Sequence, residues 1–342
     1  MPLTLSVVWA SYLNRHLYRL VVKSKRADEL GAYHLEYRLA RGGMGEVWVA
    51  KHRLLSRYTA VKVIRPEVLR TQNMKAEAVT RKRFEREANA TSSLRNPHTV
   101  SLYDFGVAKD GSFYYVMELL EGIDLQELVD RFGPVHPGRV KNIMIQVCES
   151  LDEAHALGMV HRDIKPRNIF LSNVGWTHDF AKVLDFGLVK TSYQDGDSLV
   201  TVDGSTAGTP AYLPPECAMG ERTVDGRADL YALGCVAYFL LSGVTVFGDS
   251  TPVALAVAHV QKTPERISER TELRVPDALE EIIMRCLEKK PERRPRSALS
   301  LAQLLRDASG IPEFSPEMAA DWWTTHRPSK GSHFAANEDR TL

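Results

Sequence analysis

The chain has 342 residues, enough for two compact domains or one large bilobed domain at about 150 residues per domain. Hydrophobic residues make up 44% of the sequence and charged residues 25%, which excludes a disordered or fibrous protein. The 44 lysines and arginines balance 43 aspartates and glutamates, so no overall field would attract an anionic membrane, and a nucleic acid is not an expected partner.

Residues 1–30 are predicted to form a basic amphipathic extension. Apolar residues recur at helical spacing between Leu5 and Val21, and five lysines and arginines precede the first acidic residue, Asp28. Such a helix could lie on a membrane surface, dock on the rest of the chain, or act as an organelle transit peptide. A non-essential extension is the plainer alternative.

The stretch from residue 31 to residue 120 is predicted to form a small sheet with one main helix. Short runs typical of strands, and one long polar helix, occur there at residues 46–52, 58–64, 74–94, 100–107 and 113–118. Helical periodicity dominates residues 121–309, so this second part is predicted to be mostly helical. The pattern therefore predicts an α+β protein with a boundary near residue 120.

The longest apolar run, from Leu230 to Leu241, has 12 residues, whereas a bilayer-spanning helix needs about 20. It is therefore predicted to be a buried core helix. Residues 310–342 are predicted to form a C-terminal tail that is partly disordered. Trp322 and Trp323 in this tail could anchor a partner, but packing of a C-terminal helix onto the second part is favoured.

The cysteines and histidines indicate neither a disulfide framework nor a metal site. The four cysteines form no Cys-x-x-Cys pair, and no histidines are spaced as a ligand pair. This pattern is typical of a reducing compartment, so a cytoplasmic location is expected.

A glycine-rich segment, ARGGMGEVW, lies between two predicted strands. Gly42, Gly43 and Gly45 would let backbone N–H groups approach a phosphate closely, although a simple hairpin turn is the alternative. Lys62 follows among apolar strand residues, where an unpaired ammonium would be costly to desolvate. Glu87 and a bound triphosphate could supply its anionic partners, whereas most lysines simply extend to the surface.

The segment HRDIKPRNIF places several chemically active side chains within eight positions. Asp163 could align an attacking hydroxyl, Lys165 could neutralise a moving phosphoryl group, and Asn168 offers an amide oxygen to a metal. In KVLDFGL, Asp185 could hold Mg²⁺ or Mn²⁺, since hard cations prefer oxygen ligands. These residues together indicate phosphoryl transfer.

These motifs resemble the protein kinase superfamily, and specifically the eukaryotic-type serine/threonine protein kinases of bacteria, from Tyr33 to Asp307. The resemblance implies a two-lobed kinase fold with a small β-rich N-lobe over residues 31–120 and a larger helical C-lobe over 121–309. It also implies an enzyme that transfers the γ-phosphoryl group of ATP, with Mg²⁺, to serine or threonine hydroxyls of proteins.

The resemblance assigns roles residue by residue. Gly42, Gly43 and Gly45 would cover the ATP phosphates, and Lys62, paired with Glu87, would bind the α and β phosphates. Asp163 would be the catalytic base. The remaining nucleotide contacts would be Val47 and Ala60 above adenine, Phe170 below it, Met117 as gatekeeper, Glu118 and Leu120 in the hinge, and Asp124 at the ribose.

The segment GTPAYLPPE resembles the end of a kinase activation segment. Thr209 would bridge Asp163 and Lys165, and Glu216 would pair with Arg294. Asp229, in an otherwise apolar helix, resembles the aspartate that braces the backbone of the catalytic segment in this family, and a bare buried carboxylate would be costly there.

With Arg162 directly before Asp163, the sequence resembles a kinase whose activation segment is ordered by a phosphate on a loop hydroxyl, because the cation would meet the new anion. The candidate hydroxyls lie between residues 191 and 209: Ser198, Thr201, Ser205 and Thr206. Thr201 is the preferred one, because autophosphorylation there would place the phosphate within reach of Arg162.

Two features depart from the family pattern. The first glycine of the usual G-x-G-x-x-G is Ala40, for which we expect a weakened affinity for ATP at most. The stretch before Asp185 is long, which predicts a hairpin turn around Asn173 to His178. Two alternative functions are distinguished by motifs. A nucleotide-binding pseudokinase scaffold would lack Lys62, Asp163 or Asp185, and an aminoglycoside-type kinase would lack the D-F-G and G-T-x-x-Y-x-x-P-E motifs.

Overall fold

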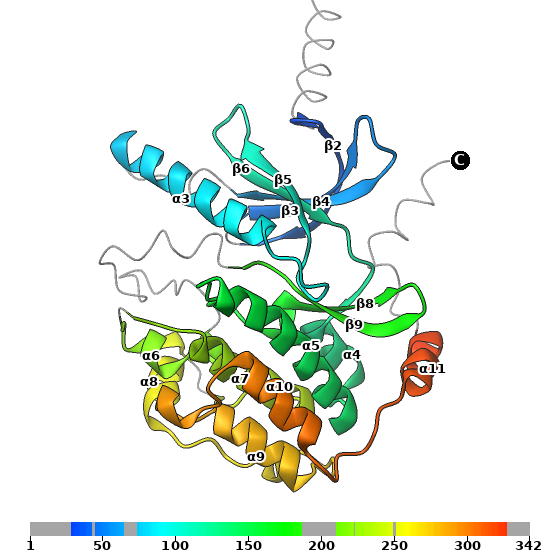
Figure 1. The fold of residues 1–342 in the computed structure, drawn as a ribbon, viewed down its shortest axis with the longest axis vertical. Coiled ribbons are helices and arrows are strands. Elements are labelled where there is room, and N and C mark those ends of the chain that lie inside the picture. Colours follow the sequence, from blue (N-terminus) through cyan, green and yellow to red (C-terminus); the bar gives the residue numbers. More distant parts are fainter. Residues whose placement is uncertain are drawn as a thin grey trace, which may run out of the picture. The chain divides into compact units, whose positions relative to one another are not determined.

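The computed structural model describes residues 29–42, 45–64, 74–186, 210–221, 223–248 and 251–326. The chain divides into two compact units (Figure 1). The first contains a β-sheet, and the second contains most of the helices and a smaller sheet. The predicted α+β class, with a β-rich first part and a helical second part, is confirmed.

The first unit is built on a six-stranded antiparallel sheet with the strand order β1-β2-β3-β4-β6-β5. Its strands are β1 (Glu29–Leu30), β2 (Tyr33–Arg41), β3 (Gly45–His52), β4 (Tyr58–Ile64), β5 (Leu102–Val107) and β6 (Phe113–Glu118). The four runs predicted as strands all form strands. One face of the sheet buries a small apolar cluster that includes Tyr33, Val61 and Val116.

The long polar helix predicted near residues 74–94 is α3 (Met74–Ser92). From Ala78 onward it belongs to the second unit, together with the following segment to Ser101. That segment is tied to helix α5 (Pro137–Ala156), because the backbone N–H groups of Arg95 and Asn96 donate to the Glu153 carboxylate. The domain limits at residues 30, 120 and 309 stay predictions.

The second unit contains the remaining helices and a three-stranded sheet. Besides α5, these are α4 (Leu125–Phe132), α6 (Pro215–Ala218), α7 (Arg227–Ser242), α8 (Pro252–Gln261), α9 (Asp277–Cys286), α10 (Ala298–Asp307) and α11 (Pro316–His326), with strands β7 (Gly122–Asp124), β8 (Ile169–Val174) and β9 (Thr177–Val183). Helix α5 packs against α7, α10 and β9. The unit therefore has one continuous core with α5 and α7 at its centre.

Helix α7 contains the longest apolar run of the sequence and is buried from Ala228 to Ser242. It ends at Gly243, whose φ of 75° is a left-handed conformation that glycine adopts without a Cβ penalty. The predicted buried core helix is confirmed. No described helix is long and apolar enough to cross a bilayer.

The hairpin predicted around Asn173 to His178 is formed by β8 and β9. Gly175, with φ of 59°, stands in the turn, and the side chains of Asn173 and His178 meet across it, with Oδ1 and Nδ1 3.0 Å apart. The predicted packing of a C-terminal helix is also confirmed, because Trp323 of α11 is buried in the core of the second unit. The proposed N-terminal helix and the end of the tail lie outside the described residues.

Candidate active site

Four of the predicted nucleotide-binding residues lie on one face of the first sheet. Val47 of β3 stands opposite Lys62 of β4, and Ala60 of β4 stands opposite Met117 of β6. Directly opposed residues in an antiparallel sheet point to the same side, and so do residues two apart in one strand. Val47, Ala60, Lys62 and Met117 therefore share a face, whereas the cluster containing Val61 and Val116 lies on the other.

Lys62 has an aromatic neighbour on the same face. Tyr115 stands opposite Lys62 in the register, and the ammonium nitrogen lies 5.6 Å from the centroid of the Tyr115 ring. A cation at this distance is attracted by the negative face of the ring. Glu87, its expected partner, is half-buried on the part of α3 that belongs to the second unit. Their pairing therefore stays a prediction.

The glycine-rich segment closes on itself between β2 and β3. The Gly42 N–H donates to the Gly45 carbonyl oxygen at 2.8 Å. A Cβ on Gly45 would lie 2.0 Å from the Val63 carbonyl oxygen, so only glycine fits where β3 meets β4. Gly43 lies outside the described residues.

In the second unit, the structure brings Asp163, Lys165 and Asn168 together. The Lys165 ammonium donates to Asp163 Oδ2 at 2.9 Å, and the Asn168 amide nitrogen donates to the same oxygen at 3.0 Å. Asn168 also donates to the Asp163 carbonyl oxygen at 2.8 Å. The Asp163 side chain is 19% exposed, so the carboxylate is oriented by two donors and still open to solvent on one side. Such a carboxylate can accept a proton from a substrate hydroxyl.

Asp229 of α7 holds the backbone of the segment that precedes Asp163, as predicted. The N–H groups of His161 and Arg162 donate to the two Asp229 oxygens, each at 2.8 Å. His155 Nε2 lies 2.8 Å from Oδ2 of the same carboxylate. Arg162 has a φ of 62°, a left-handed conformation that is unfavourable for a residue with a Cβ and is held here by these bonds.

His161 connects the catalytic segment to the segment that carries Asp185, a role that the sequence did not reveal. The Asp163 N–H donates to His161 Nδ1 at 3.2 Å, so the ring hydrogen is on Nε2, which donates to the Leu184 carbonyl oxygen at 2.7 Å. The His161 ring also packs against Phe186, with centroids 4.6 Å apart. The ring is fully buried, and its position in the HRD motif was the only available signal.

The two predicted metal ligands come from segments that are bonded to each other. The Leu184 N–H, next to Asp185, donates to the Asn168 carbonyl oxygen at 2.9 Å. The Asn168 amide nitrogen is used for Asp163, so its side-chain oxygen is the atom that could serve a cation. An amide oxygen with the Asp185 carboxylate fits Mg²⁺, which takes one or two carboxylates together with phosphates and water. Among the residues described, no three His, Cys, Asp or Glu side chains could hold a metal by themselves.

Asp124, predicted to contact the ribose, caps helix α4. Its Oδ1 accepts the Glu127 N–H at 2.9 Å, and it stands opposite Phe170 in the pairing of β7 with β8. Burial raises the pKa of the Asp124 carboxyl, against the opposing effect of this backbone N–H. Leu120 precedes β7 and is half-buried, and Glu118 ends β6 in the first unit.

The predicted pair of Glu216 and Arg294 is confirmed. The guanidinium donates to both carboxylate oxygens, at 2.7 and 2.8 Å, and both side chains are buried. Arg294 also donates to the carbonyl oxygens of Arg227, Glu288 and Lys289. Thr209, expected to bridge Asp163 and Lys165, lies outside the described residues, as do the candidate phosphorylation sites from Ser198 to Thr206.

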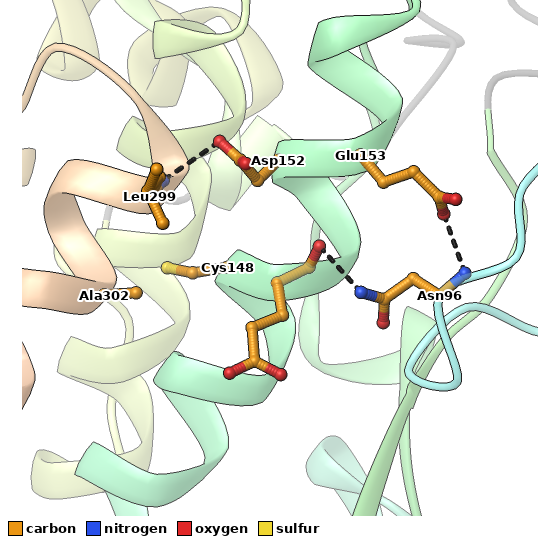
Figure 2. Close-up of a pocket in the computed structure, with 7 residues that line it drawn as sticks. Asn96, Cys148, Asp152, Glu153, Leu299 and Ala302 are labelled. Carbon is orange, nitrogen blue, oxygen red and sulfur yellow. Dashed lines mark hydrogen bonds between the residues drawn. The ribbon is translucent and has the colours of Figure 1, made fainter.

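Figure 2 shows a different pocket of the second unit, of about 290 Å³. It is lined by Asn96, Cys148, Glu149, Asp152, Glu153, Leu299 and Ala302. Its acidic side chains have structural partners: Glu153 accepts the Asn96 N–H, Asp152 accepts the Leu299 N–H, and Glu149 pairs with Arg306. None of the predicted site residues lines this pocket, so we assign it to the packing of α5 against α10 and the segment after α3.

Comparisons with known proteins agree with this geometry. A family described as "Protein kinase domain" matches residues 33–306. The chain is 38% identical over 268 residues to the serine/threonine-protein kinase pkn3 of Myxococcus xanthus, covering 78% of this chain and 48% of that protein. It is 37% identical over 293 residues to the serine/threonine-protein kinase PknB of Mycolicibacterium smegmatis, covering 84% of this chain and 45% of that protein. The chain thus spans about half the length of the curated relatives it matches.

Solved structures show the same fold. The kinase domain of Mycobacterium tuberculosis PknI aligns with a TM-score of 0.63 at 27% identity, covering 82% of this chain and 97% of that one. A structure of Rad53 in complex with AMP-PNP aligns with a TM-score of 0.64 at 24% identity, covering 79% of this chain and 64% of that one, and supports the fold alone.

Proposed function

Since the chain belongs to the family of protein kinase domains, we propose that it transfers the γ-phosphoryl group of ATP to serine and threonine hydroxyls of proteins. The observation that carries this proposal is the cluster of Asp163, Lys165 and Asn168 on a backbone braced by Asp229. Lys62, Asp163 and Asp185 are all present, which disfavours a scaffold that binds nucleotide without transfer.

In the proposed reaction, the Asp163 carboxylate aligns the substrate hydroxyl and accepts its proton. The hydroxyl oxygen forms a bond to the γ-phosphorus, the bond from that phosphorus to the bridging oxygen breaks, and ADP leaves. Lys165 lies against Asp163 and would compensate the negative charge of the moving phosphoryl group.

The proposed ATP contacts keep the roles predicted from the sequence. Gly42, Gly43 and Gly45 would contact the phosphates, and Lys62, paired with Glu87, would hold the α and β phosphates. The adenosine would be bound by Val47, Ala60, Met117, Glu118, Leu120, Asp124 and Phe170. Asn168 and Asp185 would hold Mg²⁺, in preference to Mn²⁺, and the bound ion would neutralise phosphate charge.

A cytoplasmic location also belongs to the proposal. All four cysteines are free thiols, and three of them are buried, which is typical of proteins from a reducing compartment. Docking of the basic extension over residues 1–30, on a membrane or on the chain itself, stays a prediction.

The substitution Asp163→Asn tests the proposal. It keeps the shape of the side chain but removes the proton acceptor, so we expect transfer to fall by at least about a hundredfold while ATP affinity changes by less than about twofold. Radiolabelled ATP with Mg²⁺ and a generic basic protein would measure transfer, and phosphoamino-acid analysis would identify serine and threonine. Titration with a fluorescent ATP analogue would measure binding.

Asp130→Asn is a matched control, because Asp130 is an exposed carboxylate on α4 that accepts only from Gln126 among the bonds described. It should transfer as the wild type does. Lys62→Met should weaken both binding and transfer. Full activity of Asp163→Asn would show that the catalytic base lies elsewhere.

A further inference from the structure

The C-terminal segment 311–326 lies beyond residues 33–306, the part of the chain that matches the family. Figure 1 shows its helix α11 beside the hairpin of β8 and β9. The contacts that hold α11 therefore lie outside the part of the chain that matches the family.

Trp323 of α11 donates a hydrogen bond to a buried ion pair. Its Nε1 lies 2.7 Å from Asp179 Oδ1 on β9, and the same oxygen accepts from Arg139 Nη2 of α5 at 2.7 Å. Arg139 Nε donates to the other Asp179 oxygen, also at 2.7 Å. Trp322 covers the guanidinium, with its ring centroid 3.9 Å away. A buried carboxylate is held firmly only when its lone pairs are satisfied, and Trp323 supplies the third donor here.

The segment before α11 is fitted to α5 just as closely. A Cβ on Gly138, near the start of α5, would lie 2.1 Å from the Pro312 carbonyl oxygen. Asn142, one turn further along α5, donates to the Phe314 carbonyl oxygen at 3.1 Å. Residues 312–314 therefore pass so close to α5 that no side chain would fit at position 138.

Asp179 is in turn the point where β9 is fixed to α5. Its φ of 57° is left-handed, a conformation that Asp tolerates better than most residues but that needs support. Gln146 of α5 donates to the Asp179 carbonyl oxygen at 3.1 Å and accepts the Ala181 N–H at 2.9 Å. From Asp179 the strand continues to Val183, about 13 Å away at the usual rise per residue, and Asp185 follows two residues later.

We propose that Trp323 is a positioning residue for phosphoryl transfer, which acts by fixing Asp179 and hence the course of β9 up to Asp185. The proposal rests on the proposed function, because it is the role of Asp185 in holding the metal that makes the course of β9 matter. Trp323 itself touches neither substrate nor metal.

Trp323→Phe tests the proposal, because it removes the N–H donor and keeps an aromatic ring and the ion pair. We expect kcat to fall by roughly tenfold, since small displacements of reacting groups cost up to about a hundredfold. The Mg²⁺ concentration at half-maximal rate should rise, while KM for the protein substrate stays unchanged. Trp322→Phe is the matched control, because it makes the same indole-to-phenyl change at the neighbouring position but leaves the hydrogen bond from Trp323 to Asp179 in place. It should lower kcat less than Trp323→Phe does.

Gly138→Ala disturbs the packing of the C-terminal segment on α5 without changing Trp323 itself. The added methyl group would displace residues 312–314, although alanine favours the helix, and the variant should reproduce the effects of Trp323→Phe. Gly248→Ala is its control, because a Cβ on Gly248 meets no atom within 4 Å.

Hydrogen exchange of residues 177–186 gives a readout that needs no activity. In Trp323→Phe these amides should exchange faster than in the wild type while α7 stays protected. Unchanged exchange and an unchanged kcat, with or without a lower midpoint of thermal unfolding, would overturn the proposal and leave Trp323 a purely stabilising residue. A wild type that transfers no phosphoryl group would instead refute the proposed function, and the exchange would then decide whether Trp323 fixes β9.

Discussion

Asp163 and Asp229 show how surroundings give two carboxylates different tasks. Asp229 is 1% exposed and accepts two backbone N–H groups, so its oxygens are occupied in shaping the segment from His161 to Arg162. Asp163 is held by Lys165 and Asn168 and keeps a solvent-exposed side. Only the second arrangement leaves a carboxylate that can exchange a proton with a substrate.

Asp124 allows the cost of a buried charge to be separated from the benefit of a helix cap. Because burial raises its folded-state pKa, the protonated form is favoured by folding, and the ionised form costs stability above that pKa. Asp124→Asn keeps the cap on Glu127 without the charge, so its unfolding free energy at pH 7 should equal or exceed that of the wild type. Asp124→Ala loses the cap and should cost about 1 kcal/mol.

Urea unfolding of the wild type and these Asp124 variants between pH 7 and about pH 4 would show whether ionised Asp124 lowers or raises the free energy of unfolding. Any advantage of Asp124→Asn should shrink as the pH falls through the pKa of Asp124, because the wild-type carboxyl then becomes neutral. If Asp124→Asn were as unstable as Asp124→Ala at pH 7, the raised pKa would not reflect a cost of burial.

At the scale of elements, buried polar contacts join segments of the second unit that lie far apart in the sequence. Asp229 of α7 supports the catalytic segment, and Glu216 of α6 reaches Arg294 after α9. Each of these contacts lies within the apolar core region of α5, α7 and α9, where few water molecules could replace a lost partner.

Glu216→Gln should therefore destabilise the protein strongly. It keeps the shape of the side chain but leaves the buried Arg294 without its anion, and breaking such a pair costs about 3–5 kcal/mol. Asp225→Asn is the matched comparison, because Asp225 pairs with Arg227 at 2.8 Å but its side chain is 59% exposed. It should cost about 1 kcal/mol or less. Chemical unfolding of both variants at neutral pH would compare them, and equal losses would contradict a special role for the buried pair.

A feature of the fold or of the candidate site could be predicted only where it leaves a recognisable pattern in the sequence. Strands β3 to β6, the polar helix α3 and the apolar helix α7 were predictable because each leaves a local pattern in the sequence, and Asp229 and Glu216 were predictable because they stand in motifs. The bond from Trp323 to Asp179 joins residues 144 apart, neither in a recognised motif, so nothing local could indicate it. His155 and His161 also escaped prediction, because a histidine in an apolar setting gives no sign of which carbonyl or carboxylate it will meet.

At the scale of the whole molecule, the two units hold their proposed site residues in different ways. In the first, strand register alone puts Val47, Ala60 and Lys62 on one face. In the second, side-chain hydrogen bonds to the backbone fix the segment around Asp163. Substitutions on the sheet should therefore change activity mainly because the side chain is lost. Substitutions around Asp163 should also change activity by shifting the backbone.

A whole-molecule prediction concerns autophosphorylation. Residues 191–209 carry several hydroxyls, and Arg162 is held next to Asp163 with its backbone fixed by Asp229. A phosphate on Thr201 would give the Arg162 guanidinium a doubly charged partner, and charge-assisted bonds of this kind order a loop. Mass spectrometry after incubation with ATP and Mg²⁺ should therefore find phosphate on Thr201.

The variants Thr201→Ala and Arg162→Ala should both reduce the activity gained during preincubation with ATP, since each removes one partner of the same contact, whereas Ser205→Ala should not. Mixing wild type with the inactive Asp163→Asn variant would show whether one molecule modifies another: phosphate on the inactive chain, appearing at a rate proportional to the wild-type concentration, requires transfer between molecules. Phosphate on the wild type alone would mean that each chain modifies its own loop. An active enzyme with no phosphate anywhere between residues 191 and 209 would refute the role of Arg162, because its guanidinium would then have no phosphate in this segment to bind.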